Sequence, residues 1–152
     1  MTIEVEVQRA SGSDFIPGDD CFQIWAGTAM EDGGSRLLTI RVVGRAESAE
    51  LNQRYRRKKG PTNVLAFAAD VPQECGVPLL GDIVICAPLV MEEAMAQGKN
   101  PQAHWAHLVI HGVLHLLGFD HQNTAQAAVM ESREISLLAS LGYPDPYARN
   151  DC

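Results

Sequence analysis

The five histidines of the chain lie close together in the sequence, in a pattern that could hold a metal ion. They fall within 18 of the 152 residues, at His104, His107, His111, His115 and His121. Histidine is the commonest protein ligand for metals and the side chain whose charge changes nearest to neutral pH. The stretch HGVLHLLGFDH, which contains the last three of them, is therefore the first candidate for chemistry.

The first four histidines are expected to share one face of a helix. Asn100 is a suitable N-cap, Pro101 suits the first helical position, and Gly118 is expected to stop the helix after residue 117. At 100° per residue, the four side chains fall within an arc of about 80°. The other residues of this helix are mostly apolar. A polar stripe on a buried helix must find partners, because an unpaired buried imidazole costs free energy.

Three of the histidines suit a single metal ion best. Two histidines four residues apart on a helix can bind one zinc ion, and both His107/His111 and His111/His115 have that spacing. A turn at Gly118 would bring His121 back to the end of the stripe. We therefore predict that His111, His115 and His121 bind one Zn²⁺ per chain. A fourth position open to water is typical of a catalytic zinc site.

The alternative is that each histidine is satisfied separately, by its own hydrogen bonds. We favour this alternative for His104 and His107, which lie one to two helical turns further from His121. We expect these two to have a structural role, or to contact the metal ligands without binding the metal themselves. Nickel or copper would also bind such a nitrogen set in vitro.

Carboxylates near the histidines could support or exclude particular reactions. Metalloprotease helices carry a glutamate directly after the first histidine, and here that position is Gly112, which disfavours peptide hydrolysis. Asp120 could orient an imidazole. Glu131 and Glu134 on the next helix could approach the site, but we expect them to be ordinary solvated or ion-paired residues.

Length and composition are those of one globular domain, which we expect to span residues 1–152. Hydrophobic residues make up 46% and charged residues 20% of the chain. The N-terminus does not resemble a secretory signal and no apolar stretch is long enough to cross a membrane, so we expect a soluble, cytoplasmic protein with no membrane partner. The cysteines form no C-x-x-C pair and are expected to be reduced; they are Cys21, Cys75, Cys86 and Cys152.

Basic residues are concentrated at one place in an otherwise acidic chain. The net charge is −7, yet the segment RYRRKK at 54–59 holds five of the twelve lysines and arginines. Such a cluster could bind phosphate groups, while the acidic remainder of the surface would repel them. The ordinary alternative is a solvated helix end, because cations favour helix C-termini.

Patterns of apolar residues, caps and breakers predict interspersed strands and helices. The expected strands are 3–9, 36–43, 63–67 and 79–86. The expected helices are 19–30 (capped by Asp19 or Asp20), 46–57, 88–98, 101–117, and a last one from 123 or 124 to 142. We predict an α+β fold in one domain. Its small mixed β-sheet is packed by helices, with a metal site at the C-terminal end of a buried helix.

Several segments resemble the YbeY family, the bacterial metal-dependent endoribonucleases of ribosomal RNA maturation. HGVLHLLGFDH looks like the family signature, and four more segments are similar: YRRKKGPTNVLAF (55–67), LLGDIVIC (79–86), AHWAHLVIHG (103–112) and LGYPDPY (141–147). The resemblance implies cleavage of single-stranded RNA, in maturation of small-subunit ribosomal RNA and in ribosome quality control. The partners it implies are single-stranded RNA, ribosomal RNA and the small ribosomal subunit.

The resemblance also implies roles for particular residues. The catalytic set would comprise Arg56 and the three zinc ligands His111, His115 and His121. A guanidinium binds two phosphate oxygens through two parallel hydrogen bonds and stays charged at physiological pH. An arginine therefore suits this chemistry. Flanking RNA phosphates would be held by Arg57, Lys58 and Lys59. Two departures remove hydroxyls near the site: Phe119 replaces a frequent tyrosine and Ala66 a usual serine.

Two other functions stay open on the sequence alone. The first is a zinc hydrolase of peptides or another small substrate, which a carboxylate placed over the metal would favour. The second is a ribosome-associated protein without catalytic activity, in which zinc only stabilises the fold. The attacking group in RNA cleavage, water or the ribose 2′-hydroxyl, also stays open.

Overall fold

The structure, a computed structural model, describes residues 3–12, 15–30, 36–69 and 79–147. Its strands are β1 (Ile3–Arg9), β2 (Arg36–Val43), β3 (Val64–Ala68) and β4 (Leu79–Cys86). Its helices are α1 (Asp19–Ala29), α2 (Arg45–Arg56), α3 (Ala87–Gln97), α4 (Pro101–Leu116) and α5 (Thr124–Ser140). The predicted α+β fold, a small mixed sheet packed by helices, is confirmed.

The sheet has the strand order β1-β2-β4-β3 and places β3 at an edge. β1 and β4 both run parallel to β2, whereas β3 runs antiparallel to β4. Val64 and Ala66 pair with Ile85 and Ile83 across this last ladder. Gly81 of β4 has φ +151°, and a Cβ there would collide with the backbone carbonyl of β3 at residue 67. This position of β4, where a Cβ would meet the backbone of the neighbouring strand β3, therefore requires a glycine.

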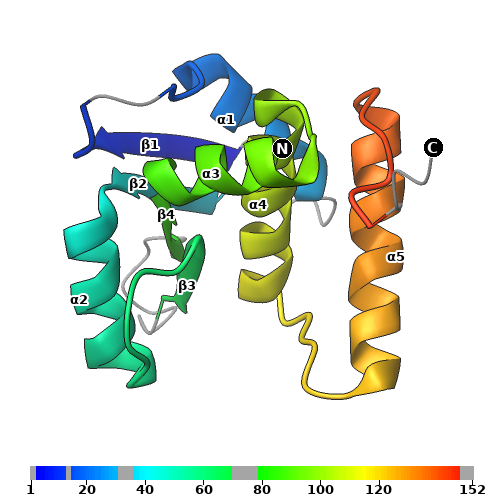
Figure 1. The fold of residues 1–152 in the computed structure, drawn as a ribbon. Coiled ribbons are helices and arrows are strands. Elements are labelled where there is room, and N and C mark those ends of the chain that lie inside the picture. The colour runs from blue at the N-terminus through cyan, green and yellow to red at the C-terminus, as the bar shows by residue number, and fades with distance from the viewer. Residues whose placement is uncertain (1–2, 13–14, 31–35, 70–78, 148–152) are drawn as a thin grey trace.

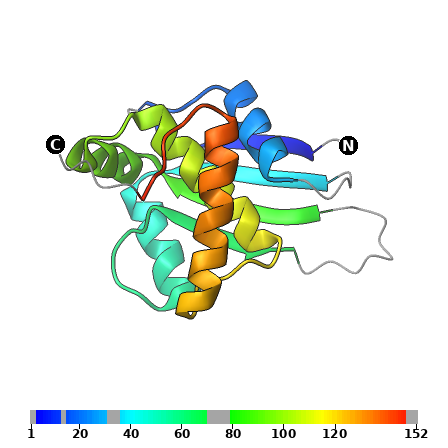
Figure 2. The same ribbon diagram turned by 90° about the vertical axis from the view of Figure 1, so that its right-hand side faces the viewer.

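Helices cover both faces of the sheet. Figure 1 shows α2 and α4 on opposite sides of β3 and β4, with α5 on the outer side of α4. Figure 2 shows α5 in front of α4, with the two helices crossing at an angle. The main core lies between the sheet, α1, α4 and α5, and a smaller cluster around Leu65 and Val84 lies under α2. Alternation of side chains along each strand separates these two cores.

The helix that carries four histidines is buried along most of its length. Asn100 caps α4 by accepting hydrogen bonds from the backbone N–H groups of Gln102 (2.8 Å) and Ala103 (3.4 Å), as predicted. Gly112 packs so tightly against Ile83 of β4 that an added Cβ would lie 2.9 Å from its Cδ1. α4 therefore sits directly on the sheet, and the glycine permits the close approach.

Some expectations differ from the structure at element ends. The N-cap of α1 is Gly18, and Asp19 and Asp20 lie in the first helical turn, where a negative charge complements the helix dipole. Asp19 pairs with Arg9 instead of capping. Cys21 is a free thiol and Cys86 is buried, whereas Cys75 and Cys152 lie outside the described residues. None of the described helices has the length and apolar character needed to cross a membrane.

Candidate active site

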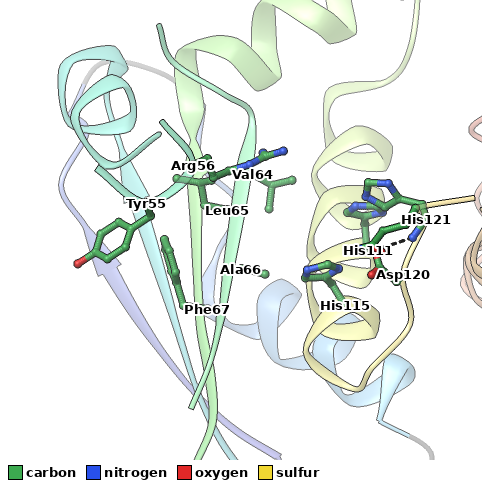
Figure 3. Close-up of a pocket in the computed structure, with 12 residues that line it drawn as sticks. Tyr55, Arg56, Val64, Leu65, Ala66, Phe67, His111, His115, Asp120 and His121 are labelled. Carbon is green, nitrogen blue, oxygen red and sulfur yellow. Dashed lines mark hydrogen bonds between the residues drawn. The ribbon is translucent and has the colours of Figure 1, made fainter. Parts of the chain in front are cut away.

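Three histidines from α4 and the following loop line one cleft of about 500 Å³. The ring centroids of His111 and His121 lie 5.7 Å apart, and those of His115 and His121 lie 6.2 Å apart. The chain reverses direction at Gly118, which has φ +105°. This left-handed turn, which favours glycine, is what returns His121 to the helix end (Figure 3).

Asp120 lies beside these histidines but holds the loop and not an imidazole. Its carboxylate accepts a hydrogen bond of 2.7 Å from the backbone N–H of His121. The expectation that it orients an imidazole is therefore not what the structure shows. The imidazoles of His115 and His121 make no hydrogen bond to any of the described residues. Both side chains are exposed at the cleft, with their ring nitrogens free for a ligand.

The opposite wall of the cleft is the edge strand β3 together with Arg56. Figure 3 shows Val64 and Ala66 on the side of β3 that faces the histidines, and Arg56 reaching across the strand toward them. Tyr55 and Phe67 pack edge to face at 4.9 Å on the other side of β3. The cleft therefore places a permanent positive charge opposite three imidazoles.

Two buried polar side chains of α2 bind the loop that follows the helix. The Ser48 hydroxyl donates to the carbonyl of Thr62 (2.8 Å) and accepts from its backbone N–H (3.0 Å). The Asn52 amide donates to the carbonyl of Gly60 at 2.9 Å. Arg57 ends α2 in the left-handed conformation, with φ +56°. These contacts hold the loop against α2, whose last residue, Arg56, lines the cleft.

The remaining basic residues lie outside the cleft. Arg57, Lys58 and Lys59 are exposed and follow Arg56 along the loop after α2. Arg54 is also exposed and pairs with Glu50 one helical turn earlier, at 3.3 Å. Of the basic residues in the segment 54–59, only Arg56 lines the cleft.

His104, at the buried end of α4, bonds to a carboxylate of α3. Its Nε2 lies 2.9 Å from Oε1 of Glu93, which also accepts a bond of 3.1 Å from the Asn63 amide. The bond from His104 is the main reason that the pKa of the Glu93 carboxyl is lowered. As expected, His104 supports the structure and does not face the cleft.

Glu134 of α5 has three hydrogen-bond partners and is completely buried, at 0% exposed. Its Oε1 lies 2.7 Å from Nδ1 of His111 and 3.1 Å from Nε2 of His107, and its Oε2 accepts a bond of 2.7 Å from the Tyr147 hydroxyl. The expectation of an ordinary solvated or ion-paired Glu134 is therefore wrong. The sequence carried a signal: Glu134 shares the α5 face of Met130, Leu137 and Leu138, and a carboxylate in an apolar stripe needs buried partners.

The charges of this network follow from its contacts. Burial by itself would raise the pKa of the Glu134 carboxyl, but the bonds to His107 and His111 outweigh it and hold that pKa at about 2. Burial lowers the pKa of His107. The pKa of the Tyr147 hydroxyl is raised, mainly by its burial and secondly by its hydrogen bond to Glu134. At neutral pH the network therefore holds an ionised carboxylate beside a neutral His107 and a neutral Tyr147.

Two overlapping groups of side chains could hold a metal ion. The potential ligand atoms of His107, His111 and Glu134 all lie within 4.8 Å of one another. The second group is His111 with His115 and His121, which line the cleft. Nitrogen donors of this kind suit zinc, copper or nickel, so the imidazoles fit a transition metal. His111 belongs to both groups and links the buried network to the open cleft.

Comparison with known proteins places the chain among closely similar sequences. The family model described as Endoribonuclease YbeY matches residues 23–142. A protein of Nitrosococcus oceani named Endoribonuclease YbeY is 52% identical over 97% of this chain and 98% of its own length. One of the same name from Methylococcus capsulatus is 52% identical over 95% of each chain. A solution structure from Thermotoga maritima, 22% identical, covers 95% of this chain and 99% of its own with a TM-score of 0.57.

Proposed function

Because the chain belongs to the YbeY family of endoribonucleases, we propose that it cleaves single-stranded RNA internally, in the maturation of small-subunit ribosomal RNA and in ribosome quality control. The observation that carries the proposal is the cleft in which three imidazoles face Arg56. In this proposal residues 1–152 act as one metal-dependent nuclease domain in the cytoplasm. The partners are then ribosomal RNA and the small ribosomal subunit.

The proposed metal ligands are His111, His115 and His121, with one zinc ion per chain. The support is that all three line the same cleft and that two of them have no hydrogen-bond partner among the described residues. A zinc ion held there would supply Lewis acidity and positive charge beside the scissile phosphate. The three imidazoles would bind it through nitrogen and leave one side open to the substrate.

Arg56 is the proposed partner of the scissile phosphate. Its guanidinium lies on the wall opposite the histidines, so a phosphate in the cleft would be approached from both sides. A fork of N–H donors binds two phosphate oxygens at once and gains strength as negative charge builds up in the transition state.

The exposed cations beside the cleft are the proposed contacts to flanking phosphates. Arg57, Lys58 and Lys59 are exposed and follow Arg56 directly in the sequence. On a chain of net charge −7, they concentrate positive charge next to the arginine that lines the cleft. Binding through such contacts should weaken as salt is raised, because each neutralised phosphate releases counterions.

Cleavage of purified small-subunit ribosomal RNA tests the proposal. Metal-loaded protein, chelator-treated protein, chelated protein resupplied with zinc, and His121→Ala prepared in parallel are compared, with casein as a second substrate. We expect RNA cleavage that chelation abolishes, zinc restores and His121→Ala lacks, with casein intact. A product ending in a 2′,3′-cyclic phosphate would identify the ribose hydroxyl as the attacking group, and a 3′-hydroxyl end would identify water.

Other results would change the conclusion. Casein cleavage without RNA cleavage would establish a peptide hydrolase. Ribosome binding by folded His121→Ala, with no RNA cleavage by metal-loaded wild type, would support a non-catalytic ribosome-associated protein. RNA cleavage that survives both chelation and the substitution would mean a contaminating nuclease.

A further inference from the structure

We propose that Glu134 is a positioning residue that sets the tautomer of His111, so that the proton stays on Nδ1 and Nε2 carries the lone pair offered to the metal. The inference rests on the proposed role of His111 as a metal ligand. It assigns a function to a carboxylate that lies behind the cleft and does not line it.

Glu134 only accepts hydrogen bonds. It is completely buried among three neighbours that can all donate: His107, His111 and Tyr147. An ionised carboxylate has acceptor sites for all three and no proton to give. A buried carboxylate without donors would be unstable, so this arrangement satisfies it fully.

The bond to Glu134 determines which nitrogen of His111 carries the proton. The Nδ1 of His111 lies 2.7 Å from Oε1 of Glu134, so it must carry the proton for this bond. A neutral imidazole has a single N–H, and its other nitrogen then has the lone pair. Metals bind only that deprotonated nitrogen. Glu134 thereby selects Nε2 of His111 as the ligand atom before any metal arrives.

Glu134 is itself held by His107 and Tyr147. Nε2 of His107 lies 3.1 Å from Oε1 of Glu134 and 3.2 Å from the Tyr147 oxygen, and the Tyr147 hydroxyl donates to Oε2. Nδ1 of His107 is buried without a hydrogen-bond partner among the described residues, as expected of a nitrogen without a proton. Nε2 of His107 is therefore a donor to Glu134. In this proposal His107, Glu134 and Tyr147 form a hydrogen-bonded support for His111, and His107 and Glu134 do not bind the metal themselves.

The first test needs no substitution. In metal-free wild type at a pH where imidazoles are neutral, ¹⁵N NMR of the imidazole nitrogens distinguishes the two tautomers of each histidine. We expect His111 to be protonated at Nδ1 and His107 at Nε2. A His111 protonated at Nε2, or exchanging evenly between both forms, would overturn the proposal.

The second test measures zinc affinity by competition with a coloured chelator. Glu134→Gln keeps the shape of the side chain but removes its charge and one acceptor, and should weaken zinc binding by about 10- to 100-fold. Tyr147→Phe is the matched control: it removes a donor to the same carboxylate but leaves the bond to His111, so affinity should stay within a few-fold of wild type. Thermal unfolding of each metal-free variant checks that it is folded.

The outcomes separate this proposal from its rivals. Loss of zinc binding by Glu134→Gln as complete as that of His115→Ala would make Glu134 a ligand and overturn the positioning role. Unchanged affinity in a folded Glu134→Gln would overturn it as well. Both readouts are independent of RNA. The proposal can therefore hold in a protein that cleaves no RNA, and its failure would leave the nuclease test untouched.

Discussion

The two halves of α4 use the same residue type on the same helix face for different purposes. In the inner half, His104 and His107 are at most 9% exposed, and each bonds to a carboxylate from another helix. In the outer half, His115 is exposed and lines the cleft together with His121 of the loop. The difference lies in what faces the helix. α3 and α5 present Glu93 and Glu134 to the inner half, whereas the outer half faces open cleft.

This contrast has an energetic basis. A buried imidazole must be hydrogen-bonded, because an unpaired polar group in the interior costs on the order of 1–3 kcal/mol. An exposed imidazole has water as a partner, so it can be left free for a ligand at little cost to the fold. His111 lies at the boundary, with one nitrogen bonded to the buried Glu134 and the ring exposed in part to the cleft.

The largest expected effect comes from removing an outer histidine. His115→Ala should lower RNA cleavage by about 10³-fold or more, because several kcal/mol of charge stabilisation depend on the metal. It should also abolish high-affinity zinc binding. Thermal unfolding of the metal-free protein should hardly change, since the side chain is exposed and makes no hydrogen bond to the described residues.

An inner histidine should show the opposite pattern. His104→Ala leaves the Glu93 carboxylate without its main partner and should lower the free energy of unfolding by about 1–3 kcal/mol. Zinc affinity of the folded protein should stay close to that of wild type. If His104→Ala lost zinc and His115→Ala kept it, the division of α4 into a supporting and a binding half would be wrong.

Two exposed arginines on α2, Arg56 and Arg54, should differ in the same way. Arg56→Ala should reduce kcat/KM for RNA by about 10²-fold, a magnitude typical of one charge-stabilising donor. Arg54→Ala, which removes a surface pair with Glu50, should change it only a few-fold. Neither substitution should shift the melting temperature by more than a degree or two, because both side chains are exposed. Equal losses from both would indicate general electrostatic attraction and not a specific contact.

Much of this arrangement could be predicted from the sequence, because the signals were local. Asn100 and Pro101 start α4, and strands β1, β2 and β4 have the predicted bounds. Gly118 indicated the reversal that brings His121 back, and this depends only on the conformational freedom of glycine. Gly112 stands where a metalloprotease helix has its glutamate, and a Cβ at this position would crowd the side chain of Ile83.

The supporting carboxylates could not be predicted in the same way. Glu93 and Glu134 lie on other helices, and whether they meet α4 depends on how the helices pack in three dimensions. Tyr147 is still more remote, 40 residues from its partner His107. A carboxylate within the apolar face of α5 indicated that some buried partner exists, but periodicity cannot name it. The placement of Arg56 opposite the histidines depends likewise on how α2, β3 and α4 pack in three dimensions.

The smallest expected effect is the acid sensitivity of the inner half. The folded-state pKa of Glu134 is about 2, below the ordinary 4.5, so its ionised form stabilises the fold above pH 4.5 and this contribution is lost as pH falls toward 2. The contribution is at most about 3 kcal/mol. The lowered pKa of His107 acts in the same direction, because below pH 6.5 the unfolded chain takes up a proton more readily than the folded one.

Denaturant unfolding of metal-free wild type and Glu134→Gln between pH 3 and 7 isolates this contribution, since the other carboxylates cancel in the difference. The difference in unfolding free energy should be constant near neutral pH and shrink below pH 4.5. A difference independent of pH would show that the bonds to Glu134 matter only for packing. The inner half of α4 would then differ from the outer half only in its packing. A difference that shrinks as expected would show that the charge of the Glu134 carboxylate stabilises the inner half. Through its bond to His111, the same charge would also support the metal site of the outer half.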